Sequence, residues 1–189
     1  MAVEFEFPLR GGPIPQEHGY LLMSGLTVQF PFLHERKIQV APVGGTRSKD
    51  GKTLTLNEKS RLHVRGLTSG EALQMRGGYI WVGDNMVFLG PAHQRVLRPS
   101  SKLVSRVVVL RDIVEPDAFV STLREWVPED GVKIEVGRQR ALSMKGMHFK
   151  GYRVTLSGLT PERSEKVLAE GLGRFHTMGC GVFAPLWEV

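Results

Sequence analysis

One order of apolar-patterned segments occurs twice along the chain, and it restricts the fold more than any other feature. Alternating or valine-rich stretches predict strands, and apolar residues at helical spacing predict helices. Residues 3–89 follow the order strand, helix, strand, strand, helix, strand, and residues 102–183 follow it again. This order is typical of ferredoxin-like units. We therefore expect an α+β protein of two tandem ferredoxin-like (RRM-like) βαββαβ units.

A change in composition separates the two expected units. Residues 90–101 are rich in proline, serine and basic residues, which is typical of a connecting segment. We expect an N-terminal unit at 1–90, a linker at 91–101 and a C-terminal unit at 102–189. A chain of 189 residues, 41% of them hydrophobic, has enough apolar material for two small cores.

The boundaries of the helices are indicated by capping residues. Helices are predicted at residues 16–30, 70–76, 117–126 and 162–170. Thr68 or Ser69 can cap the second helix, and Thr160 before Pro161 is a cap with a first-turn proline for the fourth. The polar residues 44–51 are expected to form a loop, at the tip of a hairpin.

Several classes of protein are disfavoured by what the sequence lacks. No apolar run reaches the roughly 18 residues that a membrane span needs, and the N-terminus has no leader pattern, so we expect a cytoplasmic protein. Cys180 is the only cysteine, which excludes an intramolecular disulfide. HExxH, DxD, CxxC and GxSxG spacings are missing, and we expect neither a metal nor another cofactor.

Positive charge is concentrated in two long stretches. The formal net charge is +6, and residues 85–111 and 136–161 contain no acidic residue. Single-sign stretches favour neutralisation of a nucleic-acid backbone. We expect these stretches to contact RNA through Arg95, Arg98, Lys102, Ser105, Arg106, Arg138, Arg140, Lys145, His148, Lys150 and Arg153. Aromatic residues are only 8% of the chain, so stacking of bases on a broad sheet is not the expected mode.

A glycine-rich stretch near the C-terminus, residues 171–185, is a candidate anion cradle. Glycine lacks a Cβ, and its backbone can approach a phosphate chain closely. The stretch lies between a predicted helix and a predicted strand, which is not the order of a nucleotide-binding P-loop. We therefore expect it to lie against an extended polyanion, with contacts from Gly171, Gly173, Arg174, His176, Gly179 and Gly181.

Two of the six histidines are candidates for RNA chemistry. A histidine can take the proton of a ribose 2′-hydroxyl or protonate a 5′-oxygen leaving group. His34 is favoured because it follows a predicted helix and has Arg36 and Lys37 beside it, and these cations can stabilise a pentacoordinate phosphate. His18, at the start of the same helix, is the second candidate.

With these features established, the chain resembles the CRISPR repeat-RNA processing endoribonucleases of the RAMP superfamily. The similarity covers nearly the full length and is carried by the glycine-rich stretch, by 18–22 with 32–35, and by 104–107. It is closest to the short myxobacterial-type branch, which also occurs in transposon-associated systems.

The resemblance implies a reaction and partners. The reaction is metal-independent cleavage of a stem-loop repeat RNA, in which 2′-hydroxyl attack leaves a 2′,3′-cyclic phosphate and the enzyme stays on its product. His34 becomes the general base or acid, with Tyr20 and Lys37 as candidate additional catalytic residues. Expected partners are the repeat RNA, the guide RNA and other subunits of a type I effector complex. Two alternatives stay open: a non-catalytic RNA-binding subunit, or a ferredoxin-like domain with a protein or small-molecule ligand.

Overall fold

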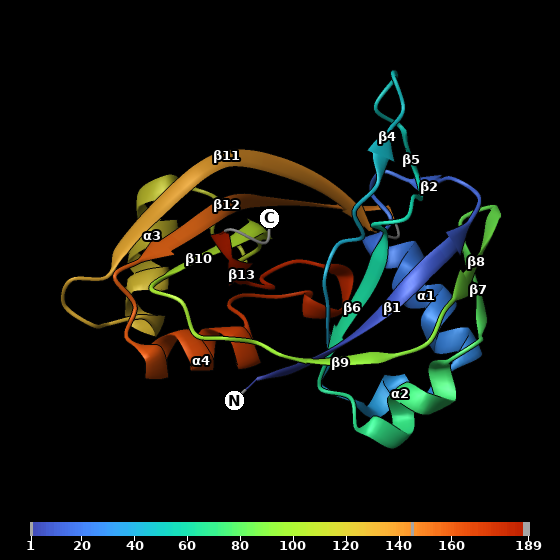
Figure 1. Ribbon diagram of the computed structural model, residues 1–189. Coiled ribbons are helices and arrows are strands. Elements are labelled where there is room, and N and C mark those ends of the chain that lie inside the picture. Colours follow the sequence, from blue (N-terminus) through green and yellow to red (C-terminus); the bar gives the residue numbers. More distant parts are fainter. Residues whose placement is uncertain (1, 145, 187–189) are drawn as a thin grey trace. The chain divides into compact units, whose positions relative to one another are not determined.

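The computed structural model describes residues 2–144 and 146–186, and it divides into two compact units (Figure 1). The N-terminal unit comprises residues 3–96, and the C-terminal unit comprises the described residues from 97 onward together with Ala2. Each unit has its own apolar core. Part of the linker expected at 91–101 is a strand instead, because the backbone of His93–Val96 pairs with that of residues 3–6.

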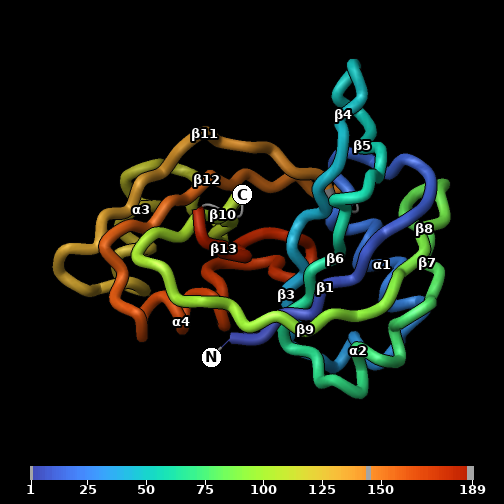
Figure 2. The backbone as a smooth tube through the Cα atoms, in the orientation of Figure 1, coloured from blue at the N-terminus to red at the C-terminus, as the bar shows by residue number. Residues whose placement is uncertain are grey.

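The N-terminal unit begins with a long strand and contains two helices. Its elements are β1 (Val3–Gly11), β2 (Ile14–Pro15), α1 (Gly19–Gln29), the 3₁₀ helix η1 (Pro31–Glu35), β3 (Gln39–Val40), β4 (Thr46–Arg47), β5 (Thr53–Thr55), β6 (Arg61–Arg65), α2 (Ser69–Met75), β7 (Tyr79–Val82), β8 (Asn85–Leu89) and β9 (His93–Val96). The predicted hairpin around 44–51 is confirmed, since β4 pairs with β5 and the two strands project from the unit (Figure 2).

The main sheet of this unit has the strand order β3-β6-β1-β8-β7, with β9 also paired to β1, and every pairing is antiparallel. In the ferredoxin-like unit the four strands, numbered in chain order, lie in the order 2-3-1-4 across the sheet. Here β3, β6, β1 and β8 take these four positions. Alternation along β1 buries Phe5, Phe7 and Leu9 in the core beneath α1 and α2. Glu4 and Glu6 alternate with them and lie on the opposite face of the sheet.

Close backbone contacts fix α1 on this sheet. A Cβ at Gly25 would lie 2.2 Å from the carbonyl oxygen of Trp81, so only glycine allows α1 to approach β7 this closely. Thr68 caps α2 as predicted: its hydroxyl accepts from the Glu71 N–H, and the Glu71 carboxylate accepts from the Thr68 N–H.

The C-terminal unit repeats the same topology. Its elements are β10 (Lys102–Val108), α3 (Pro116–Trp126), β11 (Lys133–Met144), β12 (Met147–Ser157), α4 (Pro161–Glu170), the 3₁₀ helix η2 (His176–Met178) and β13 (Ala184–Pro185). The strand order β11-β12-β10-β13 is again 2-3-1-4, with antiparallel pairing throughout. The chain is therefore an α+β protein of two tandem ferredoxin-like folds.

The helices of the C-terminal unit cover one face of its sheet, and the glycine-rich loop covers part of the other. Phe119 of α3 and Leu168 of α4 share a core with Val154 of β12. Val107 and Val109 instead pack with Cys180 from the glycine-rich stretch. The expected final strand at 182–183 lies two residues later, as β13. No helix among the described residues is long and apolar enough to cross a membrane.

Candidate active site and nucleic-acid interface

His34 is presented to solvent from an anchored turn. It lies in η1, where Pro31 begins the 3₁₀ helix and Leu33 is only 1% exposed. Because Leu33 packs into the core of the N-terminal unit, the turn is held in place while the His34 side chain beside it is exposed. An accessible imidazole on an anchored turn meets the first requirement of a general acid or base, which is access to the substrate.

The residues after His34 are tied to the start of α2. The Nε of Arg36 donates to Glu71 Oε1 at 2.6 Å, and a second guanidinium nitrogen lies 2.5 Å from the same oxygen. The hydrogen bond from the Thr68 N–H has the largest effect on Glu71 and lowers its pKa. Burial raises this pKa by less, and Arg36 lowers it further. Arg36 was expected to bind RNA, but its charge is already paired with this carboxylate. Lys37 is exposed.

His18 has a structural position. Its side chain is buried, at 3% exposure, before the first turn of α1. The N–H of Val43 donates to Nε2 at 3.0 Å, so Nε2 carries no proton, and Nδ1 donates to the Pro15 carbonyl at 3.1 Å. Both ring nitrogens are therefore used to join the segments that flank α1. This arrangement explains a histidine at position 18 without catalysis.

Tyr20 and His34 are separated by most of the length of α1. Tyr20 is half-buried in the first turn, whereas His34 follows the last. Eleven residues at 1.5 Å per residue make α1 roughly 16 Å long. Lys37, in contrast, is only three residues from His34. The fold therefore groups Lys37 with His34 more directly than it groups Tyr20 with it.

The glycine-rich loop uses its backbone internally. The N–H groups of Leu172 and Gly181 donate to the carbonyls of Gly181 and Val107, at 3.0 and 2.7 Å, and that of Arg174 donates to Val109 at 3.0 Å. The N–H groups of Met178, Gly179 and Cys180 bond within the stretch, and that of Gly171 donates to the Val167 carbonyl of α4. These donors are not directed at an anion, so the loop differs from the predicted backbone cradle.

The glycines are explained by contacts with the protein's own backbone. A Cβ at Gly181 would lie 1.9 Å from the Leu172 carbonyl oxygen, and one at Gly173 would lie 2.6 Å from that of Val109. Both residues also have positive φ, at 64° and 90°. Gly171, Gly179 and Gly181 are buried, and the sequence alone could not distinguish close approach to phosphate from close approach to the sheet.

His176 packs on Gly171 and Gly181, where the two ends of the glycine-rich loop are in contact. A Cβ at Gly171 would be 3.1 Å from its Nε2, and one at Gly181 would be 2.9 Å from its Cδ2. Burial lowers the pKa of His176, against the opposing effect of the Leu172 backbone. The ring also lines a cavity of about 490 Å³ with Lys166 and Trp126. His176 is therefore neutral near pH 7.

Arg174 is the exposed cation of the loop. Its guanidinium carbon lies 4.9 Å from the centre of the Phe175 ring, which packs edge-on against Phe149 of β12. The cation is thus held beside the open face of the C-terminal sheet.

The predicted basic residues of the C-terminal unit do not share one face. Alternation along β12 places Arg153 on the side of Phe149, which packs with the glycine-rich loop. His148 and Lys150 lie on the other side, in phase with the helix-covered Tyr152. Two of the predicted side chains are half-buried, namely Arg106 and Arg140. The exposed ones are Arg98, Lys102, Arg138, His148, Lys150 and Arg153.

Two further predicted contacts need separate mention. Ser105 is 1% exposed and its hydroxyl donates to the Val107 carbonyl, so it supports the strand. Lys145 lies outside the described residues.

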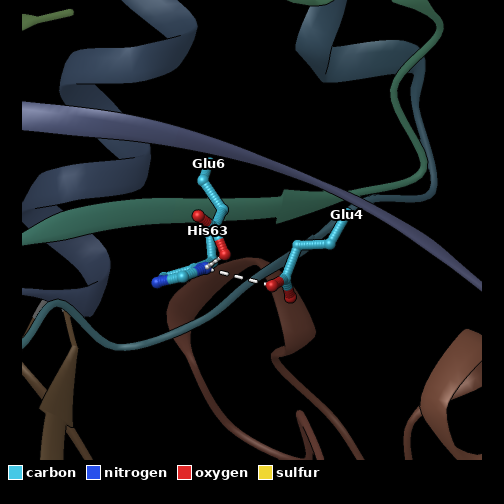
Figure 3. A group of neighbouring side chains, drawn as sticks. All are labelled: Glu4, Glu6 and His63. Carbon is cyan, nitrogen blue, oxygen red and sulfur yellow. Dashed lines mark hydrogen bonds and ion pairs between the residues drawn. The ribbon is translucent and has the colours of Figure 1, made fainter. Parts of the chain in front are cut away.

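Arg95 belongs to an ion-pair network in the N-terminal unit, and three other members of this network, Glu4, Glu6 and His63, are drawn in Figure 3. It lies 2.7 Å from Glu4 and 2.9 Å from Glu6, and Arg65 lies 2.9 Å from the second oxygen of Glu4. Its charge is thus already neutralised, contrary to the expected role in RNA binding. Pairing across 91 residues of sequence could not be seen in the local charge pattern.

Glu4, Glu6 and His63 belong to the same network. Among the described residues they are the one group whose carboxylate and imidazole atoms lie close enough together to hold a metal ion. Burial raises the pKa of Glu4, but the hydrogen bond with His63 and the charge of Arg65 outweigh it and lower the pKa to about 2. Because two guanidinium groups already balance the two carboxylates, the group has a complete set of protein counter-ions.

A surface that sequence reasoning missed lies on the β7–β8 hairpin. Tyr79 and Trp81 are 53% and 61% exposed, and they alternate with buried Ile80 and Val82. The alternation by itself predicts only a strand. The signal that was overlooked is that the outward positions are both aromatic.

The described residues form two tandem ferredoxin-like folds, with a glycine-rich loop after the last helix. The sequence matches the family described as Cas6 Crispr over residues 3–188, and the chain belongs to this family. It is 30% identical over 190 residues to the CRISPR-associated endonuclease Cas6 of Myxococcus xanthus (strain DK1622), covering 97% of this chain and 81% of that protein. The myxobacterial relative agrees with the branch that the sequence resembles.

Solved structures share the fold at low identity. One described as an RAMP protein binding different RNA substrates has a TM-score of 0.73 at 13% identity, covering 96% of this chain and 98% of that chain. Thermus thermophilus Cse3 bound to an RNA representing a pre-cleavage complex has a TM-score of 0.56 at 14% identity, covering 97% and 98%. At this identity the similarity establishes the fold.

Proposed function

We propose that this chain is a metal-independent endoribonuclease that binds and cleaves CRISPR repeat RNA stem-loops to release mature guide RNA. Membership of the Cas6 family and a curated relative that is an endonuclease support this proposal. The RNA-bound Cse3 structure supports an RNA substrate for the fold. The cleaved RNA stays bound to the protein. The partners are the repeat RNA, the guide RNA and other subunits of a type I effector complex, which can be of the transposon-associated kind.

The observation that carries the proposal is the exposed His34 on its anchored turn. Of the two candidate histidines, His18 has both ring nitrogens bonded within the protein, and His34 is exposed. His34 acts as the general base or acid, and the exposed Lys37 stabilises charge on the phosphate.

The reaction is a transfer within the RNA strand. The 2′-oxygen loses its proton and forms a bond to the adjacent phosphorus, while the bond from phosphorus to the 5′-oxygen breaks and that oxygen gains a proton. The products are a 2′,3′-cyclic phosphate and a 5′-hydroxyl. Every step is a proton transfer or a phosphoryl displacement, so no metal ion is needed to balance it.

RNA is held by side chains rather than by the glycine-rich backbone. The loop's N–H groups bond within the protein, which leaves the exposed Arg174 as its main cationic contact. Arg153, on the same face of the sheet as this loop, extends the contact along β12. Arginine and lysine contacts of this kind give affinity that falls with salt.

A cleavage assay in EDTA tests the reaction. The purified chain is incubated with a labelled repeat stem-loop RNA, and with the same RNA carrying a single 2′-deoxy nucleotide at the cut position. We expect cleavage of the first RNA, a cyclic-phosphate end on its 5′ product, and tight binding without cleavage of the second. Cleavage that EDTA abolishes, or cleavage of the 2′-deoxy bond, contradicts the proposal. Retention of both RNAs uncut would leave a non-catalytic RNA-binding subunit.

A further inference from the structure

The β7–β8 hairpin carries a contiguous set of large apolar side chains on its solvent face. Tyr79 is paired across the strands with Phe88, and Trp81 with Met86. The rings of Tyr79 and Phe88 lie 5.1 Å apart, centre to centre. We refer to Tyr79, Trp81, Met86 and Phe88 as the aromatic hairpin face. Tyr79, Trp81 and Met86 are among the most exposed large hydrophobic side chains of the chain, at 53%, 61% and 47%.

The backbone beneath this face is held rigidly. Ile80 and Val82 on its inner side are buried, at 1% and 0% exposure. Gly25 lets α1 pack directly on the carbonyl of Trp81, where a Cβ would lie at 2.2 Å. The exposed rings are therefore mounted on a fixed strand rather than on a loose loop, which lowers the conformational entropy that a ligand would have to remove.

An exposed cation adjoins the aromatic hairpin face, together with a pocket that is lined by polar and apolar residues. Arg10 of β1 is exposed and is the cross-strand neighbour of Phe88. Arg10 also lines a pocket of about 510 Å³, to which Arg61 and Asn57 contribute. Stacking surfaces next to arginine and amide groups are the means by which proteins bind unpaired bases and the adjoining phosphates.

We propose that the aromatic hairpin face and Arg10 form a binding site for unpaired RNA bases, with Trp81 and Tyr79 stacking on bases and Arg10 contacting phosphate. This inference rests on the proposed function. A face of aliphatic side chains would suit a protein partner. Three aromatic rings with an exposed arginine at their border suit single-stranded RNA better, because every base offers a stacking surface.

The strand that carries the site packs, on its inner side, against the segment that leads to His34. A Cβ at Gly78, the residue before Tyr79, would lie 2.5 Å from the ring of Phe30. Phe30 is the residue directly before η1, which carries His34. Phe30 is buried, so this contact joins the hairpin to the start of η1 on the core side of the sheet. A single-stranded flank of the repeat is the part of the RNA that the outer, aromatic face takes.

Binding measurements with two RNAs test this site. One RNA is the repeat stem-loop with its single-stranded flank, and the other is the stem-loop alone. We expect Trp81→Ala to weaken binding of the flanked RNA roughly 5- to 150-fold, the loss of one base stack, and to leave the stem-loop unaffected. Trp81→Phe keeps a stacking ring and retains most of the affinity. Trp126→Ala removes an exposed tryptophan of the C-terminal unit and is the matched control.

The outcomes separate this inference from the proposed function. A wild-type chain that binds neither RNA contradicts the proposed function, and the inference falls with it. Equal affinity of wild type and Trp81→Ala for the flanked RNA overturns the inference and leaves the function standing. A Trp81→Ala change that alters self-association but not RNA affinity also overturns it, in favour of a protein-binding face. Thermal unfolding checks that each variant is folded. If Trp81→Ala is unfolded, the double variant Arg10→Ala/Tyr79→Ala takes its place in the same binding measurements.

Discussion

The two units share one topology and differ in what is added to it. Both have the strand order 2-3-1-4. The N-terminal unit inserts η1 with His34 between α1 and β3, and it adds β7 beside its fourth ferredoxin-like strand, β8. The C-terminal unit has the long β11–β12 pair and folds its glycine-rich loop back on the sheet. The difference indicates that the common fold supplies a scaffold, and that function lies in the additions.

The units also differ in how their charges are used. Around β1 of the N-terminal unit, carboxylates and guanidinium groups are paired with one another. On β12 and the glycine-rich loop of the C-terminal unit, Lys150, Arg153 and Arg174 are exposed cations in acid-free sequence. We therefore assign cleavage to the N-terminal unit and much of the phosphate neutralisation to the C-terminal unit, and the predictions below test this division.

The largest effect on stability is expected from Gly181→Ala. The new Cβ would overlap the Leu172 carbonyl, and φ is positive, so the change should cost roughly 3–5 kcal/mol in the C-terminal unit. Gly131→Ala is the matched control, because Gly131 also has positive φ but open space around it. Its cost should be about 1–2 kcal/mol.

Hydrogen exchange resolved along the sequence measures both changes. Loss of protection confined to the C-terminal unit is the expected pattern for Gly181→Ala. Equal losses for the two variants would show that the close crossing of the loop does not stabilise this unit.

Acid should weaken the N-terminal unit through Glu4. The pKa of Glu4 is lowered from 4.5 to about 2, so its contribution is present above pH 4.5 and is lost as the pH falls from 4.5 toward 2. The contribution is roughly 3 kcal/mol. Glu4→Gln should remove this pH dependence, whereas Glu35→Gln, at an exposed position, should keep it. Denaturant unfolding at a series of pH values measures the effect, and an unchanged acid slope in Glu4→Gln would refute it.

Lys37→Ala should slow cleavage by roughly 10- to 100-fold with little change in RNA affinity, because the role we propose for its ammonium group is to stabilise the transition state beside His34. Single-turnover rates and binding constants are measured on the same RNA. Tyr20→Phe provides the comparison at the other end of α1. A fall in affinity without a fall in rate would move Lys37 from catalysis to binding.

The smallest effect is expected for Arg174→Ala. It should weaken RNA binding by roughly 3- to 10-fold and reduce the slope of log affinity against log salt by about 1, while the rate at saturating protein is unchanged. Lys133→Ala is the control, since Lys133 is already paired with Glu135 at 3.3 Å. A salt slope that Arg174→Ala leaves unaltered would place this arginine outside the RNA interface.

Local sequence signals predicted much of the fold. The doubled element order, the Thr68 and Thr160 caps and the hairpin tip within 44–51 all depend on residues close in sequence, and the structure has each of them. Strand β9 was missed because its pairing partner is β1, about 90 residues away.

The site was harder to predict because its features depend on distant contacts. The glycine-rich stretch has the composition of an anion cradle, but its glycines meet Val109 and Leu172 rather than a ligand. Arg95 lies in an acid-free stretch, yet the strand pairing brings Glu4 and Glu6 to it. The sequence ranks His34 above His18 only by its basic neighbours, and the fold adds that His18 is buried and His34 exposed.

The most direct test compares two exposed histidines of the N-terminal unit in EDTA. Single-turnover cleavage of repeat RNA is measured for wild type, His34→Ala and His93→Ala, with RNA binding measured in parallel. We predict that His34→Ala retains RNA but cleaves it 10²–10⁴-fold more slowly, and that His93→Ala cleaves at the wild-type rate. Wild-type cleavage by His34→Ala would contradict the account.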